Sequence, residues 1–270
     1  MKKIALFIFL MLFGAALVLL FLYRSEMEES ISAFFADTPK VATSDFPGYP
    51  EGAPVNALVE HAYYSMNYNV RTLQPDWVMY HLSRALADQP GLAVPSDSFR
   101  ADPLLLDVTA EESDFRRSGF VKGPLVPVLH MNWANSAITQ SFLISTVSPR
   151  NPRFQRETWV ALDSLIKDWA SSSKSLYVVS GPVFKQRIRM IGRNRVAVPE
   201  YFFRVVLDRQ TPEVKAIGFL MENAPTKRTL RQLAVPVDSV EAFTGLDFFS
   251  ALPDSLESVV ESGFEWKDWR

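Results

Sequence analysis

The longest apolar run lies at the start of the chain. Residues 4–23 are 20 consecutive uncharged positions, and Lys2 and Lys3 stand directly before them. Twenty helical residues span about 30 Å, which is the thickness of a bilayer's hydrocarbon core. Basic residues beside such a segment stay on the cytoplasmic side. The pattern predicts a signal anchor in residues 1–24, with the remaining chain held on the extracytoplasmic side of a membrane (periplasmic in a bacterium). A cleaved signal peptide is the alternative, and it exports the same domain.

After the anchor, the pattern changes from a linker to a folded domain. Residues 25–54 are acidic and then rich in Pro and Gly, which predicts an extended linker. In residues 55–270, β-branched and aromatic runs alternate with turn residues, and residues 154–170 carry apolar side chains at helical spacing. The expected strands are residues 60–68, 77–82, 176–179, 195–198, 202–207 and 216–221, with a turn at 74–76 and a break at 181–182. The expected helices are residues 154–170, 237–244 and 254–262.

This order of elements predicts an α+β domain with a mostly antiparallel sheet and packed helices. The chain contains no cysteine, which excludes disulfides, thiolate metal sites and cysteine nucleophiles. It also contains no Gly-rich phosphate loop and no dinucleotide fingerprint. Trp133, Trp159 and Trp169 are expected in the core.

The net charge of −2 conceals a basic central segment. Residues 116–195 contain 13 Lys and Arg but only 3 Asp and Glu, an excess of +10, while the rest of the chain carries −12. A basic segment in an acidic chain is what a polyanion-binding face requires. Solvated charges that never converge on one surface are the alternative.

Several motifs follow one another in a recognisable order. They include YSMNYN at 64–69, FRADP at 99–103, SGFVKGPLVPVLHM at 118–131, STVSPR at 145–150, and SGPVF at 180–184. From residue 64 to residue 256 the series resembles the DNA/RNA non-specific endonucleases, an endonuclease G-like group with a ββα-metal fold. The resemblance implies that fold for the domain.

In that family, a strand motif Asp-Arg-Gly-His supplies a histidine that activates water for attack on a phosphodiester, and an asparagine at the start of a helix holds Mg²⁺. Alignment on Gly123 puts Val121, Lys122 and Pro124 at the aspartate, arginine and histidine positions. Proline has no titratable side chain, so Pro124 cannot act as the general base. Gln155 stands at the metal-binding asparagine, and Asp163 stands at a supporting glutamate. The resemblance therefore implies a degenerate catalytic site of Lys122, Pro124 and Asp163, with Gln155 as the candidate metal ligand and weak or lost Mg²⁺ binding.

Two residues offer a replacement base. His130 lies six positions beyond Pro124, on the same side of an extended strand, and Lys122 lies within the motif itself. A packed histidine is the alternative for His130, and we assign no catalytic role to His61 and His81. The acidic residues Asp102, Asp107, Glu111 and Glu112 match no metal-ligand spacing and are expected to be solvated.

Basic residues surround the motif and the predicted helix start. Arginine side chains bind phosphate in a forked geometry, and a helix N-terminus adds partial positive charge. Pairing with Glu111, Glu112 and Asp114 is the alternative role for some of them. A charged hairpin, with Lys185, Arg187, Arg189, Arg193 and Arg195, is expected further along the chain. The candidate nucleic-acid contacts are Arg116, Arg117, Lys122, Arg150, Arg153 and Arg156.

The sequence favours a membrane-anchored, endonuclease-like domain with impaired catalysis that still binds DNA, RNA or another polyanion without base preference. One alternative is an active metal-dependent nuclease with a rebuilt site, in which Lys122 or His130 is the base and Gln155 and Asp163 hold the metal. Another is an envelope module that binds protein through a dry, apolar site formed by Val121, Pro124, Val126 and Val128.

Overall fold

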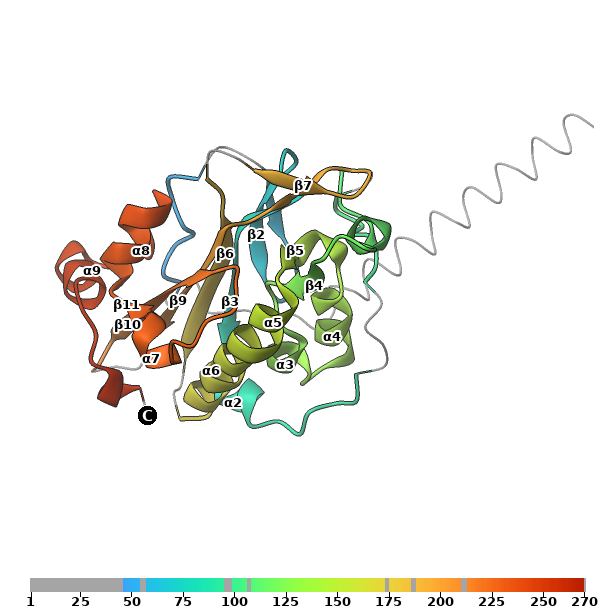
Figure 1. The fold of residues 1–270 in the computed structure, drawn as a ribbon. Helices are drawn as coiled ribbons and strands as arrows, with labels where there is room; N and C mark the ends of the chain where they lie inside the picture. The colour runs from blue at the N-terminus through green and yellow to red at the C-terminus, as the bar shows by residue number, and fades with distance from the viewer. Residues whose placement is uncertain are drawn as a thin grey trace, which may run out of the picture. The chain divides into compact units, whose positions relative to one another are not determined.

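Figure 1 shows the computed structural model of the chain, which describes residues 46–53, 57–94, 99–105, 108–172, 175–185, 188–209 and 213–269. The predicted anchor and most of the predicted linker lie outside the described residues. Within the described ranges, none of the helices combines the length and apolar character needed to span a bilayer.

A seven-stranded antiparallel sheet forms the centre of the domain (Figure 1). Its strand order is β1-β2-β3-β6-β9-β10-β11, and each neighbouring pair is antiparallel. The predicted α+β class with a mostly antiparallel sheet is therefore confirmed. The strands are β1 (Ala57–Glu60), β2 (Ser65–Asn69), β3 (Gln74–Leu82), β6 (Leu176–Val183), β9 (Tyr201–Asp208), β10 (Lys215–Glu222) and β11 (Ala234–Val235).

Helices cover both faces of this sheet because side chains alternate between the faces along each strand. On β3, Val78 and Tyr80 enter the core beneath α6 (Val160–Ser172), whereas Trp77 and Met79 enter a second core beneath α8 (Val237–Thr244) and α9 (Asp254–Glu261). The α6 face also carries α2 (Arg84–Ala87), α3 (Val128–Met131), α4 (Asn135–Ser141) and α5 (Pro152–Phe154). The remaining short helices are α7 (Leu230–Leu233), η2 (Glu112–Phe115), η3 (Ile144–Thr146) and η5 (Trp266–Asp268).

Two short two-stranded sheets lie outside the main sheet. Strand β4 (Val121–Pro124) pairs with β5 (Val147–Arg150), and β7 (Arg189–Ile191) pairs with β8 (Val196–Val198), as predicted for the charged hairpin. They share a third apolar cluster that includes Phe115, Val147 and Val196.

Several boundaries differ from the predictions. The single strand predicted at residues 60–68 is interrupted: β1 ends at Glu60 and β2 begins at Ser65, because the chain turns between them and the His61 N–H donates to the Tyr64 carbonyl oxygen at 2.9 Å. The turn between β2 and β3 lies at residues 70–73, because Pro75 is paired within β3 and Leu73 takes the positive φ of 56°. Strand β6 continues through Gly181 and Pro182; the proline is tolerated because pairing with β3 ends at Ser180.

Residues 46–53, predicted as linker, pack onto the domain. Tyr49 stacks on Trp77, and Glu51 forms a backbone bridge with Asp247. The folded region therefore begins before the predicted residue 55.

Candidate functional site

Strands β4 and β5 lead directly into the longest helix of the domain. Lys122 is opposite Pro149, and Gly123 is opposite Ser148. After β5 the chain runs through α5, a π-helical turn η4 (Gln155–Trp159) and then α6, so two strands and a helix form one continuous unit. The motif predicted at 118–131 stays extended only as far as Pro124, because a bend follows and Val128–Met131 form α3.

The helix begins where the sequence supplies an N-cap. The Asn151 Oδ1 accepts hydrogen bonds from the backbone N–H groups of Arg153 (2.9 Å) and Phe154 (3.2 Å), and Pro152 occupies the first helical position. Asn223 holds the end of β5 by donating from Nδ2 to the Pro149 carbonyl oxygen at 3.1 Å. These contacts fix the direction in which Gln155 leaves the helix start.

Arg150 fills the space between the motif strand and the helix start. Its Nη1 donates to Gln155 Oε1 at 2.7 Å, and its Nη2 donates to the Pro124 carbonyl oxygen at 2.9 Å. The guanidinium carbon lies 3.6 Å from the centre of the Trp159 ring, and the residue is 0% exposed. Burial lowers the pKa of Arg150 well below its usual value. A Cβ at Gly123 would lie 2.5 Å from Arg150 Cδ, so glycine is required beside this side chain.

A second buried arginine lies beside the first. Arg204, from β9, forms an ion pair with Asp163, donates from Nε to Ser180 Oγ at 2.8 Å, and lies 4.2 Å from the Trp159 ring centre. Asp163, the predicted supporting acid, is therefore bound to Arg204. The alternation of β9 did not single out Arg204, because a charged residue on a strand is usually exposed.

His130 is a packed residue of α3, which confirms the packed-histidine interpretation, and it does not lie on an extended strand with Pro124. Its Nε2 lies 2.7 Å from the backbone carbonyl oxygen of Asp163, which can only accept, so Nε2 donates. Its Nδ1 then accepts from the Tyr80 hydroxyl at 2.8 Å. Burial lowers the pKa of His130 to about 4. With both nitrogens engaged and 1% exposure, the imidazole has no free position from which to activate water.

Lys122 is half-buried and points to an acid. Its Nζ contacts Glu112 Oε1 at 2.6 Å and lies 5.1 Å from the centre of the Phe99 ring. The Lys122 hydrogen bond, followed by the backbone N–H of Phe99, lowers the pKa of Glu112. The Lys122 Nζ is therefore engaged by the Glu112 carboxylate.

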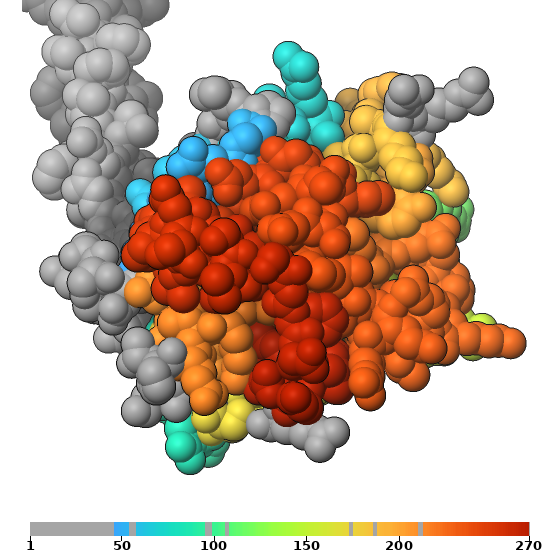
Figure 2. Space-filling view, turned by 90° about the vertical axis from the view of Figure 1, so that its left-hand side faces the viewer, coloured from blue at the N-terminus to red at the C-terminus, as the bar shows by residue number. Residues whose placement is uncertain are grey.

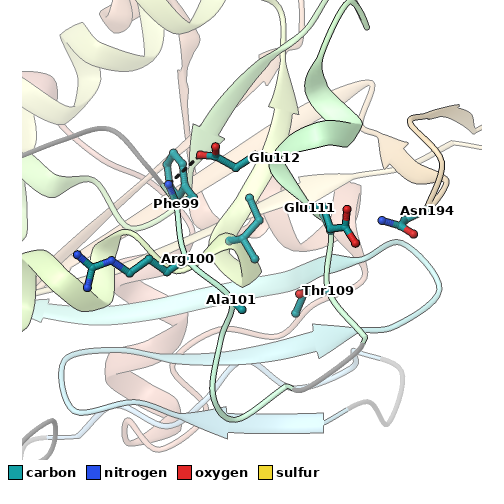
Figure 3. Close-up of a pocket in the computed structure, with 9 residues that line it drawn as sticks. Phe99, Arg100, Ala101, Thr109, Glu111, Glu112 and Asn194 are labelled. Carbon is teal, nitrogen blue, oxygen red and sulfur yellow. Dashed lines mark hydrogen bonds between the residues drawn. The ribbon is translucent and has the colours of Figure 1, made fainter. Parts of the chain in front are cut away.

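A polar cavity lies on the other side of Glu112 (Figure 3). It has a volume of about 380 Å³ and lies between the loop at Phe99–Ala101 and the segment carrying Thr109, Glu111 and Glu112. Figure 3 shows Glu111 and Asn194 facing each other at one end. Arg100 also lines this cavity, and Glu112 is paired with Lys122, so the lining carries charges of both signs.

Asp102 is buried, which corrects its predicted solvated state. It contacts His61 Nε2 at 3.0 Å, accepts from the Leu104 N–H at 2.9 Å, and bonds to the Ser145 hydroxyl. We predicted no catalytic role for His61, and nothing in the residues around His61 indicated that it would contact Asp102. Among the predicted core residues, Trp159 and Trp169 are buried and Trp133 is partly buried against the core.

The predicted nucleic-acid contacts divide into separate environments. Arg116, Arg117, Arg153 and Arg156 are all exposed. Arg153 and Arg156 also contact Glu157, at 2.9 Å and 3.5 Å. Arg150 is 0% exposed and cannot contact a phosphate on the surface, so its prediction as a nucleic-acid contact is wrong. Of the residues predicted for the protein-binding alternative, Val126 is buried, and Val121, Pro124 and Val128 are partly exposed.

The site does not fit the Mg²⁺ ion that the resemblance implies. Gln155 Oε1 and the Pro124 carbonyl oxygen both accept from a guanidinium, and a fixed positive charge there repels a divalent cation. Asp163 is committed to Arg204. Among the described residues, the one group of three acidic or histidine side chains close enough to share an ion does not include Asp163.

Known proteins share both this fold and this sequence pattern. The sequence model of the DNA/RNA non-specific endonuclease family matches residues 45–255. The chain is 28% identical to mitochondrial endonuclease G of Bos taurus over 238 residues, covering 78% of this chain and 79% of that protein. It is 26% identical to a nuclease of Nostoc sp. over 266 residues, covering 92% and 95%.

A crystal structure of the EndoG/EndoGI complex has the same fold. It superposes with a TM-score of 0.70 at 22% identity, covering 83% of this chain and 92% of that one. Since the family match spans more than half of the sequence, this chain belongs to the DNA/RNA non-specific endonuclease family.

Proposed function

We propose that this chain is a family member that has lost the ordinary hydrolytic mechanism and retains sequence-independent binding of nucleic acid. The carrying observation is the position of Arg150. Its guanidinium donates hydrogen bonds to oxygens of Pro124 and Gln155. The family resemblance aligns these two residues with the general base and the metal ligand. A buried cation that makes these hydrogen bonds supports the loss of metal binding. Pro124 supports the loss of the base.

The neighbouring groups do not supply a replacement base. Lys122 is held by Glu112, and His130 uses both ring nitrogens within the core. Loss of a general base alone slows a reaction by about 10²–10⁴-fold. The loss of both the base and the metal site leaves hydrolysis without its two main contributions.

Nucleic-acid binding is proposed for an exposed set of five arginines, which we call the basic face: Arg116, Arg117, Arg189, Arg193 and Arg195. Two contacts join η2 and the residues that follow it to the β7–β8 hairpin. Arg189 Nη2 donates to the Ser118 carbonyl oxygen at 3.4 Å, and the backbone N–H of Asn194 donates to Asp114 Oδ1 at 3.0 Å. These contacts bring arginines that are about 70 positions apart in sequence onto neighbouring segments. Phosphate contacts of this kind give affinity without base preference.

A cleavage assay tests the proposed loss of catalysis. The full-length protein is incubated with plasmid DNA and with RNA in Mg²⁺, Mn²⁺ or EDTA. We expect no metal-dependent cleavage. Cleavage that needs metal and disappears in Gln155→Ala would instead establish an active nuclease with a rebuilt site. The variant Pro124→His, combined with Arg150→Met, serves as a test of whether the family chemistry can be restored.

A binding assay tests the basic face separately. We expect a mobility shift with DNA and RNA alike, weakening steeply as salt rises. Removing Arg189 and Arg193 by alanine substitution should reduce the slope of log K against log salt by about 1 per lost phosphate contact. Lys267→Ala is the matched control, because it removes an exposed positive charge near the C-terminus, away from β7 (Figure 1). No shift at low salt would exclude polyanion binding and favour the protein-interaction alternative.

For location, we propose that residues 1–24 anchor the chain in a membrane with the domain on the extracytoplasmic side. The support is the apolar run after Lys2 and Lys3. Fractionation of cells that express the full-length chain tests it. Recovery of the chain in the soluble fraction, shortened at its N-terminus, would indicate a cleaved signal instead.

A further inference from the structure

Three carboxylates converge on the sheet face opposite the β4–β5 unit. Asp238 and Glu241 lie three positions apart on α8, so they share one side of that helix, and Glu261 is the last residue of α9. One carboxylate oxygen from each residue lies within 4.8 Å of those from the other two. Figure 2 shows this face of the molecule, with the segments that form α8 and α9 in orange and red.

Glu261 is the member that needs an explanation. It is 5% exposed, and its Oε1 is buried without a hydrogen-bond partner. An unpaired carboxylate in such a place costs free energy unless a proton or a cation compensates it. Burial, and then the charges of Glu241, Glu257, Asp238 and Asp247, raise the pKa of Glu261 to about 8. The charged groups that act on it from α8, α9 and the loop after α8 are all acidic.

The other two carboxylates are placed to share an ion. Glu241 is oriented by the backbone N–H of Phe248, which donates to its Oε1 at 2.8 Å. Asp238 is exposed, so water can complete a coordination shell from that side. Carboxylate oxygens are the ligands of hard cations, and Ca²⁺ accepts six to eight oxygens at roughly 2.3–2.6 Å.

The composition of the cluster favours Ca²⁺ over Mg²⁺. Ca²⁺ accepts irregular and variable sets of carboxylate and water oxygens, so three carboxylates on two helices can bind it without forming an ideal polyhedron. Mg²⁺ instead demands a nearly ideal octahedron and gives up its water reluctantly.

We propose that Asp238, Glu241 and Glu261 form a binding site for one Ca²⁺ ion that joins α8 to α9. The ion would compensate the buried carboxylate of Glu261 and hold the C-terminal helices to each other. The site uses none of the residues of the proposed nucleic-acid function, and it stands or falls independently of that function.

Thermal unfolding of the full-length protein tests the proposal. The protein is freed of metal with a chelator and then titrated with CaCl₂ or MgCl₂, and isothermal calorimetry gives the stoichiometry. We expect one Ca²⁺ per chain and a Tm that rises by roughly 5–10 °C when Ca²⁺ is 100-fold above its Kd, because the ion binds only the folded state. Mg²⁺ should raise the Tm less.

Isosteric variants locate the ion. Glu261→Gln and, separately, Glu241→Gln should abolish the Ca²⁺-dependent rise in Tm. Glu257→Gln is the matched control, since it removes the same charge from the same helix without touching the three carboxylates, and it should keep most of the rise. An equal rise in Glu261→Gln, or no rise in the unchanged protein, would overturn the proposal. If Glu261→Gln does not fold, Glu241→Gln and the calorimetric stoichiometry of the unchanged protein decide.

Discussion

Arg150 and Arg204 are both fully buried over the same indole, yet they are balanced in different ways. The guanidinium carbons lie 3.6 Å and 4.2 Å from the Trp159 ring centre. Arg204 has a carboxylate partner in Asp163, whereas the hydrogen-bond partners of Arg150 are the neutral oxygens of Pro124 and Gln155. Among the described residues, Asp163 is therefore the one carboxylate that contacts these two buried guanidinium groups, and it contacts only Arg204.

This difference bears on the proposed loss of hydrolysis. A site that hydrolyses phosphodiesters through a metal needs oxygens that are free to bind a cation. Here the helix-start oxygen is occupied by an arginine, and the nearby acid is occupied by another. The indole lets both positive charges remain in the core, because a guanidinium binds favourably over an aromatic face. A divalent ion would have to enter a region that already has an excess of positive charge.

The largest expected effect comes from breaking the charged half of this pair. Arg204→Met leaves Asp163 buried without its ion-pair partner, which should lower the free energy of unfolding by about 3–5 kcal/mol. Arg150→Met leaves only neutral acceptors unpaired and should cost about 1–3 kcal/mol. Urea unfolding of the two variants measures both values. Equal losses would contradict the view that only Arg204 is matched to a carboxylate.

Acid should lower the stability of the folded protein through His130, which donates a hydrogen bond to the backbone of Asp163. Its folded-state pKa, about 4, lies below the ordinary value of 6.5, so between these pH values the unfolded chain binds a proton that the folded chain does not. Stability at this position is present above pH 6.5 and is lost as pH falls toward 4. Between pH 7 and pH 5 the loss should be about 2 kcal/mol.

Urea midpoints measured at several pH values check this expectation. His130→Phe removes the titrating group, so its midpoint should depend less on pH in that range, even though the variant starts from lower stability. Parallel curves for the two proteins would assign the acid sensitivity to other groups.

The sequence predicted the sheet and the helices well where each element's signal was local. The helix at Val237–Thr244 matches its prediction, and the helix that includes α6 continues past Ala170 only to Ser172. Apolar spacing and turn residues carry such information within a few positions. The predicted break at Gly181 and Pro182 failed for a non-local reason. Whether a proline fits in a strand depends on the neighbouring strand, and β3 ends its pairing at Ser180.

The candidate site was predictable as a set of replaced residues but not as a geometry. The resemblance identified Pro124, Gln155 and Asp163 as departures from the family pattern. It gave no indication that Arg150 would turn inward, because arginine is rarely fully buried and its contacts come from distant segments. Pro124, which accepts a hydrogen bond from Arg150, is 26 positions away from it in sequence, and the rings of Trp159 and Phe202 pack against the Arg150 guanidinium. Convergence of this kind exists only once the chain has folded.

The smallest expected effect comes from an arginine at the other extreme of exposure. Arg153 lies in α5, three positions beyond Arg150, and contacts Glu157 at 2.9 Å, but its side chain is 62% exposed. An ion pair in water gains little, because solvent and salt screen it. Arg153→Ala should therefore leave the urea midpoint unchanged within error at both low and high salt. A clear loss of stability would mean that Arg153 supports the helix start, and with it the position of Gln155 against Arg150. The contrast between the buried arginine at the end of β5 and the exposed arginine of α5 would then no longer hold.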